Sequence, residues 1–120
     1  MMTPEKLNLH MQSAVQLHQQ GDLAKAEVLY REALKSAPNN SDIMNLIGAL
    51  CSQDNRPDEG LILLTQALTL QPGHPHYLLN IGQTQVQLGL FDEAINNFKH
   101  ALKQQPQSAI THLIWLAVIN

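Results

Sequence analysis

Apolar residues recur along this chain at intervals of three and four, in runs separated by short polar stretches. In the run FDEAINNFKHALKQQP, one face of a helix would carry Phe91, Ala94, Ile95, Phe98 and Ala101. The other runs keep the same spacing. The pattern therefore predicts an all-α fold, with helices over residues 5–19, 23–36, 41–53, 57–70, 75–87, 91–104 and 109–119.

The ends of these helices are marked by residue type. Every second run stops near a proline, because proline lacks the backbone N–H that a continuing helix needs and disfavours helical geometry in the preceding residue. Between the two runs of a pair stands Gly21, Asn55 or Gly89, and these types accept a left-handed backbone. Helix starts are expected at first-turn prolines and at serine N-caps, namely Pro57, Pro75, Ser41 and Ser108.

The runs repeat with a fixed period. Proline falls at Pro38, Pro72 and Pro106, which are 34 residues apart. Small residues keep the same step in both halves of the unit, as Ala14, Gly48 and Gly82 and then as Ala26, Gly60 and Ala94. Small side chains at matched positions let two backbones approach closely, so each unit is expected to be a helical hairpin.

A larger set of residues recurs in this register: Ala26, Tyr30, Ala33, Pro38; Gly60, Leu64, Ala67, Pro72; Ala94, Phe98, Ala101, Pro106. This set resembles the second half of the tetratricopeptide repeat pattern, whereas the Leu-Gly of the first half is replaced by Ser13-Ala14, Ile47-Gly48 and Ile81-Gly82. The resemblance implies one array of repeats over 7–40, 41–74 and 75–108, with a partial repeat or capping helix at 109–120. It also implies a right-handed α-solenoid of antiparallel hairpins, whose first helices line a concave groove that binds extended or helical peptides.

By the same resemblance, certain first-helix positions face the groove, and they are nearly uncharged: Met11, Val15, His18, Asn45, Ala49, Ser52, Leu79, Gln83 and Val86. Asn45, Asn80 and Gln83 are candidates for reading the backbone of a partner. Family members that clamp an acidic C-terminus use Lys, Arg and Asn, where this chain has Met11, Val15, Leu46, His76 and Asn80. An acidic tail is therefore a disfavoured ligand. Plain solvent-exposed helix surface remains the alternative for each of these positions.

Composition narrows the partner class. The formal net charge is −3, and the seven Lys and Arg residues are scattered, so nothing indicates a nucleic-acid-binding face. The lone Cys51 cannot form an intrachain disulfide, and the N-terminus lacks the apolar stretch of an export signal. ITHLIWLAVIN is too short to cross a membrane. A cytoplasmic protein with protein or peptide partners is expected.

Residues with chemistry are present but are not arranged for catalysis. The six histidines share no metal-ligand spacing, and no glycine-rich phosphate loop or nucleophile elbow occurs. Asp58-Glu59 and Asp92-Glu93 open second helices, where negative charge complements the helix dipole. We expect no enzyme activity, no cofactor and no metal site.

The last predicted helix is apolar on all sides, and a helix of that kind must be buried. Its exposed face would carry Leu113, Ile114, Trp115 and Val118. Two explanations stand: the chain is a piece of a longer protein whose next helix covers this face, or two copies form a homodimer through it.

The function predicted from sequence is a non-catalytic protein–protein interaction scaffold that holds a peptide or protein segment. The alternative is an N-terminal recognition module of a larger bacterial enzyme. Segments such as GDLAKAEVLYREALKSAPNN are similar to the repeats that precede glycosyltransferase, sulfotransferase or methyltransferase domains.

Overall fold

A computed structural model describes residues 1–105 of the chain, and these residues form six helices and no strand. The helices are α1 (Pro4–Gln19), α2 (Leu23–Ser36), α3 (Ser41–Gln53), α4 (Pro57–Leu70), α5 (Pro75–Gln87) and α6 (Phe91–Gln104). Five of them have the predicted bounds, and α1 begins one residue earlier than predicted. The all-α prediction is confirmed for this part, while the helix predicted at 109–119 lies outside the described residues.

Three of the six described helices, α1, α2 and α3, begin where a side chain accepts a hydrogen bond from an unpaired N–H of the first turn. Thr3 Oγ1 accepts from the Lys6 N–H, and Asp22 Oδ1 accepts from the Lys25 N–H. The prediction that Ser41 caps α3 is wrong. Asn40 is the N-cap, and its Oδ1 lies 3.1 Å from the backbone nitrogen of Ile43.

Ser41 is instead the first residue of α3 and is buried. An extended asparagine one position earlier already serves as the cap, which leaves the serine hydroxyl free to accept hydrogen bonds from other elements. The second predicted serine cap, Ser108, lies outside the described residues. Pro57 and Pro75 do occupy first-turn positions, as predicted.

The turns inside the hairpins have the expected left-handed geometry. The φ angle is +85° at Gly21, +59° at Asn55 and +79° at Gly89. Asn55 is the only residue other than glycine with positive φ among the described residues. Asparagine tolerates this conformation better than most residues, so the chain reverses at the same point of each hairpin.

Small residues bring the two helices of a hairpin together. A Cβ atom added to Gly48 would lie 2.6 Å from Leu64 Cγ and 2.9 Å from the carbonyl oxygen of Gly60, and one added to Gly82 would overlap the ring of Phe98. These distances are too short for non-bonded carbon atoms. The larger side chains fill the space on either side, and Tyr30, Ile47, Leu50, Leu64 and Phe98 are fully buried.

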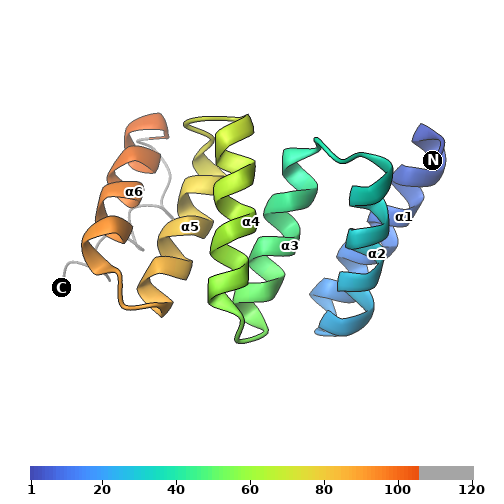
Figure 1. Cartoon of the computed structure of the whole chain (residues 1–120), viewed down its shortest axis with the longest axis horizontal. Coiled ribbons are helices and arrows are strands. Elements are labelled where there is room, and N and C mark those ends of the chain that lie inside the picture. Colours follow the sequence, from blue (N-terminus) through green and yellow to red (C-terminus); the bar gives the residue numbers. More distant parts are fainter. Residues whose placement is uncertain (106–120) are drawn as a thin grey trace.

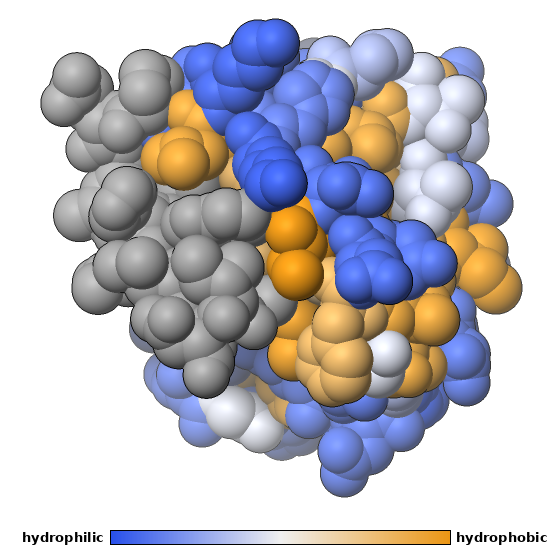
Figure 2. All heavy atoms as spheres, turned by 90° about the vertical axis from the view of Figure 1, so that its left-hand side faces the viewer, coloured by the Kyte–Doolittle hydropathy of each residue, from blue (hydrophilic) through white to orange (hydrophobic). Residues whose placement is uncertain are grey.

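The hairpins lie side by side in chain order and form an elongated stack of 44 × 26 × 23 Å (Figure 1). Each second helix also packs on the next first helix, as α2 does on α3 and α4 on α5. On the end of the stack that faces the viewer in Figure 2, both hydrophilic and apolar side chains reach the surface. Large apolar residues are exposed where the chain enters α6, namely Leu90 and Phe91.

No helix within residues 1–105 is both long and apolar enough to span a membrane.

Candidate partner-binding face

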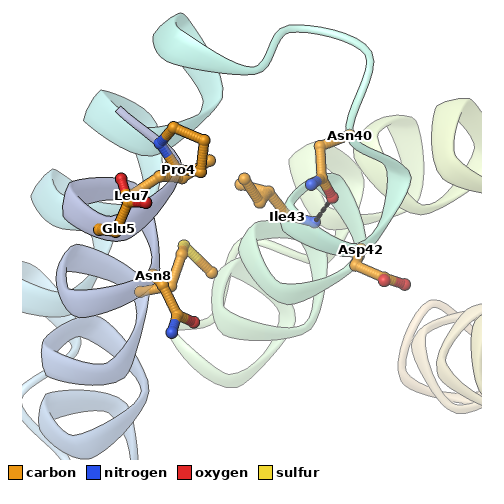
Figure 3. A pocket seen from close by; sticks show the side chains of 8 residues that line it. Pro4, Glu5, Leu7, Asn8, Asn40, Asp42 and Ile43 are labelled. Carbon is orange, nitrogen blue, oxygen red and sulfur yellow. Dashed lines mark hydrogen bonds between the residues drawn. The ribbon is translucent and has the colours of Figure 1, made fainter. Parts of the chain in front are cut away.

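The surface formed by α1, α3 and α5, which we call the first-helix face, contains two hollows between helices. The first hollow, of about 570 Å³, lies between α1 and α3 and is lined by Pro4, Glu5, Leu7, Asn8, Met11, Asn40, Asp42 and Ile43 (Figure 3). The second hollow, of about 190 Å³, lies between α3 and α5 and is lined by Ala49, Ser52, Gln53, Asn80, Gln83, Thr84 and Gln87. A shallower depression follows the side of α1 past Met11 and Val15.

The structure distributes the predicted groove residues over these features. Met11 belongs to the first hollow, and Ala49, Asn80 and Gln83 belong to the second. Val15 lines the depression on α1. The self-association residues predicted at Leu113, Ile114, Trp115 and Val118 lie outside the described residues.

Several predicted groove residues are engaged in contacts within the protein. Leu79 is 8% exposed and belongs to a core cluster with Leu78, Ala94 and Phe98, against which the partly buried Val86 packs. Asn45 accepts a hydrogen bond from Asn80. Leu79 is therefore buried in the core, while other predicted residues of this face line the hollows.

Hydrogen bonds join α3 to α5 along the second hollow. Asn80 Nδ2 donates to Asn45 Oδ1 at 2.9 Å, and the Ser52 and Thr84 hydroxyl oxygens are 2.8 Å apart. Gln87 Nε2 donates to the Ser52 carbonyl oxygen at 3.0 Å. Because Thr84 is 2% exposed, its hydrogen bond to Ser52 is shielded from water. The polar side chains of this junction largely satisfy one another.

Tyr77 closes the same junction near the start of the helices. Its ring is 1% exposed and stacks on His74 with 3.8 Å between ring centroids. Its hydroxyl donates to Asp42 and also lies 3.0 Å from Ser41 Oγ, which accepts from Gln71 Nε2 at 2.6 Å. Burial raises the pKa of Tyr77, and the bond to Asp42 raises it further.

His18 connects the first two hairpins. Its Nδ1 lies 2.9 Å from the Tyr30 hydroxyl, and its Nε2 lies 2.5 Å from Gln53 Oε1. Burial raises the pKa of Tyr30 to about 12, so this phenol stays protonated at neutral pH. His18 was predicted as a groove residue, and both its ring nitrogens are engaged in contacts within the protein.

One group of side chains in residues 1–105 has the spacing of metal ligands: Glu27, Cys51 and Glu59 each offer an atom within 4.8 Å of the others. Both carboxylates already form ion pairs with arginines. Arg31 donates to Glu27 and Glu59 at 2.8 Å, and Arg56 bonds to the same two acids. The hydrogen bond from Arg56 lowers the pKa of Glu27, while burial raises that of Cys51. The cluster is an ion-pair network between α2 and α4.

Charge is distributed unevenly between the two helix layers. Neither α3 nor α5 contains Lys or Arg, and α1 contains Lys6 alone. Lys6 lines a separate depression beside Glu32 and Lys35 of α2. The two charged residues that line the hollows of the first-helix face are both acidic, namely Glu5 and Asp42.

Sequence reasoning missed most of the first hollow. Pro4, Leu7, Asn8 and Ile43 are not among the positions that the resemblance assigns to a groove. A signal was available in the 34-residue register, because Ile43 stands where the next repeat has the larger Tyr77. A smaller side chain at a junction leaves space between neighbouring hairpins.

Stacked helical hairpins with a 34-residue period and hollows between their first helices define a helical-repeat module for protein interactions. Two family models described as tetratricopeptide repeat match residues 14–75 and 53–114. The chain belongs to the tetratricopeptide repeat family, and the solenoid fold implied by the sequence resemblance is confirmed. Repeats of this family are generally non-catalytic modules that bind protein or peptide partners.

Similar proteins come from different contexts. The chain is 30% identical over 81 residues to the BBSome complex member bbs-4 of Caenorhabditis elegans, which covers 68% of this chain and 18% of that protein. A Thermobaculum terrenum O-GlcNAc transferase contains the same fold, with a TM-score of 0.91 and 26% identity over 99% of this chain and 23% of the transferase. The chain therefore spans about a fifth of the length of these two proteins.

A third similar structure is the first tetratricopeptide domain of Spaghetti (RPAP3), bound to the HSP90 peptide SRMEEVD. It matches with a TM-score of 0.88 and 13% identity over 98% of this chain and 93% of that one. At this identity the match supports the fold alone.

Proposed function

We propose that the chain binds an extended or helical segment of another protein on the first-helix face. The observation that carries the proposal is that this face has open hollows between helices that are already in place. A surface that is already ordered loses little conformational entropy on binding, so more of the energy of its contacts contributes to affinity. Gln83, which is exposed at the second hollow, is suited to hydrogen-bond a peptide backbone, whereas Asn80 beside it already donates to Asn45.

Selection of peptides from a random display library on the full chain tests this proposal. The affinity of the selected peptides is then measured for Gln83→Tyr, which obstructs the second hollow, and for Gln66→Tyr, a matched change on α4. Gln66 is exposed and lies on the α2–α4 side of the stack. We expect Gln83→Tyr to weaken binding about tenfold, or about 1.4 kcal/mol, and Gln66→Tyr to leave it unchanged. Equal effects of the two changes would contradict the proposal.

A second candidate is that the array is the recognition module of a larger enzyme. The similarity to the O-GlcNAc transferase supports this alternative, because the matching repeats make up 23% of that enzyme. Sequencing the reading frame beyond Asn120 tests it. A catalytic domain downstream would support the enzyme module, whereas further repeats followed by a stop codon would contradict it.

Self-association through residues 109–119 remains a further proposal, resting on the apolar pattern of that segment. Sedimentation of the full chain should reveal a homodimer, and Trp115→Glu should shift it toward monomer. A monomeric wild-type chain would contradict this proposal. A cytoplasmic location is proposed on the lone, buried Cys51, which suits a reducing compartment.

A further inference from the structure

We propose that the first hollow is the anchoring site of the partner segment, and that it takes one bulky apolar side chain with a basic residue beside it. This inference rests on the proposed function and specifies the chemistry of the ligand.

The walls of the first hollow are apolar. Pro4, Leu7 and Met11 come from α1, and Ile43 comes from α3. Pro4 and Ile43 face each other across the space (Figure 3). A volume of about 570 Å³ lies within the range of small-ligand sites. The unbranched Met11 side chain can adjust to occupants of different shape.

The equivalent space at the second junction is filled. Tyr77 stands where the first junction has Ile43, and its hydroxyl bonds to Ser41 and Asp42. The pair Asn45 and Asn80 stands where the first junction has Met11 and Leu46, and their amides bond to each other. The first junction has neither the large ring nor the amide bond, so the partly buried Leu7 and Met11 stay accessible, while Ile43, which is 2% exposed, belongs to the core beneath them.

Water is a poor occupant of the apolar part of this site. An ordered water needs two to four polar partners, and the side chains of Pro4, Leu7, Met11 and Ile43 offer none with significant strength. The Asn40 side chain at the rim is already used to cap α3. An apolar side chain that enters the hollow therefore gains by displacing water that has few hydrogen bonds there.

Acidic side chains at the first hollow favour a basic residue next to the apolar anchor of the bound segment. Glu5 forms no ion pair within residues 1–105. Asp42 also lines the hollow, but its carboxylate points away from the space between Pro4 and Ile43 (Figure 3) and accepts a hydrogen bond from Tyr77 of α5. The N-termini of α1 and α3 each contribute about half a positive charge, which offsets only part of these two carboxylates. Since α3 and α5 contain no Lys or Arg, a basic flank is attracted and an acidic one is repelled.

Fluorescence anisotropy on the full chain at low salt tests this assignment. The probes are short labelled peptides of Ser and Gln with a central Leu-Lys, Ala-Lys or Leu-Glu pair, together with the acidic peptide SRMEEVD. We expect the Leu-Lys peptide to bind about tenfold more tightly than each of the others, a difference of about 1.4 kcal/mol. Equal affinity for Leu-Lys and Ala-Lys would overturn the apolar anchor, and equal affinity for Leu-Lys and Leu-Glu would overturn the basic flank.

Two variants with matched controls locate the binding. Met11→Gln should weaken the Leu-Lys peptide about tenfold, whereas Met44→Gln, a partly buried methionine beside Arg31 and Leu34, should not. Glu5→Lys should weaken the same peptide, whereas Asp58→Lys, an exposed first-turn acid of α4, should not. Circular dichroism confirms that each variant keeps its helicity.

The outcomes separate this inference from the proposed function. If Gln83→Tyr weakens the selected peptides and Met11→Gln does not, the first-helix face binds the partner and the anchoring site is wrong. If neither change matters, both proposals fail. If Met11→Gln abolishes a concentration-dependent dimer of the chain alone, the hollow is covered by a second copy and the inference is overturned.

Discussion

The two junctions between neighbouring hairpins are built from the same repeat and differ in character. Between α3 and α5, Asn80 bonds to Asn45 and Thr84 bonds to Ser52, and the helices pack together. Between α1 and α3 the positions of the asparagine pair hold Met11 and Leu46. There α1 and α3 pack less closely, and a hollow remains between them.

The second layer shows the opposite arrangement. Behind the first junction, Glu27 of α2 is held by Arg56 beside α4 in an ion-pair network. Behind the second junction, the equivalent positions are Leu61 and Leu90. At the positions compared, the first junction is apolar on the first-helix face and ionic behind, while the second is polar on that face and apolar behind. Elsewhere on the first junction, His18 bonds to Gln53.

This contrast shows that, in a repeat protein, different residues determine the hairpin architecture and the binding surface. Small residues and turn residues at fixed positions set the hairpins and their spacing. A few other positions, such as Ile43 against Tyr77, then decide whether neighbouring hairpins close together or leave a site. Exchanging such residues between the two junctions should therefore exchange which junction packs closely and which contains a hollow.

The largest effect is expected from Tyr77→Ile, which gives the second junction the residue of the first. The change removes the stacked ring and the hydroxyl bonds to Ser41 and Asp42. We expect a loss of about 2 kcal/mol in the free energy of unfolding, measured by urea denaturation. Tyr77→Phe keeps the ring and should lose only about 1 kcal/mol. Equal losses for the two variants would show that ring packing does not close this junction.

A smaller effect is expected from exchanging the amide pair. Asn80→Leu alone leaves the amide of Asn45 without its partner and should cost about 1 kcal/mol. Adding Asn45→Met reproduces the first junction, and the double variant should recover part of that loss because both polar groups are then gone. A double-mutant cycle in urea measures the coupling. Strictly additive losses would mean that the hydrogen bond contributes nothing to the junction.

The smallest effect concerns the ion-pair network behind the first junction. The hydrogen bond from Arg56 lowers the pKa of Glu27 below its ordinary value of 4.5. A carboxyl group whose pKa is lowered by folding stabilises the folded state at pH values above its ordinary pKa. That contribution disappears as the pH falls through the pKa of the folded state. The side chains are partly exposed, so the contribution should stay below about 1 kcal/mol.

Glu27→Gln provides the reference for this pH effect. Between pH 7 and pH 3 the urea midpoint of the wild type should fall more than that of the variant, because only the wild type loses the Glu27 charge. Other carboxyl groups titrate in both proteins and cancel in the difference. Identical falls would contradict a stabilising role for the network.

The hairpin architecture could be predicted from sequence because its determinants are local. Left-handed turns at Gly21, Asn55 and Gly89, first-turn prolines and the 34-residue period define the helix bounds without reference to distant contacts. The N-cap of α3 is harder to predict, because the sequence offers both Ser41 and the residue that caps the helix, Asn40. Both types cap helices well, and only the backbone geometry distinguishes adjacent candidates.

The hollows could not be predicted in the same way because they depend on contacts between repeats. Leu79 and Gln83 occupy positions named for the groove, yet Leu79 is buried and Gln83 is exposed. His18 bonds to Tyr30 and Gln53, which the spacing along the chain does not reveal. Side-chain volumes on two neighbouring hairpins must be compared together before a gap between them becomes visible.

The most direct test of the account is an isotope-filtered NOE spectrum of the labelled chain with an unlabelled peptide selected by display. An apolar anchor in the first hollow predicts contacts from an apolar side chain of the peptide to the methyl groups of Met11 and Ile43. Contacts confined to residues of α2, α4 and α6 would contradict it.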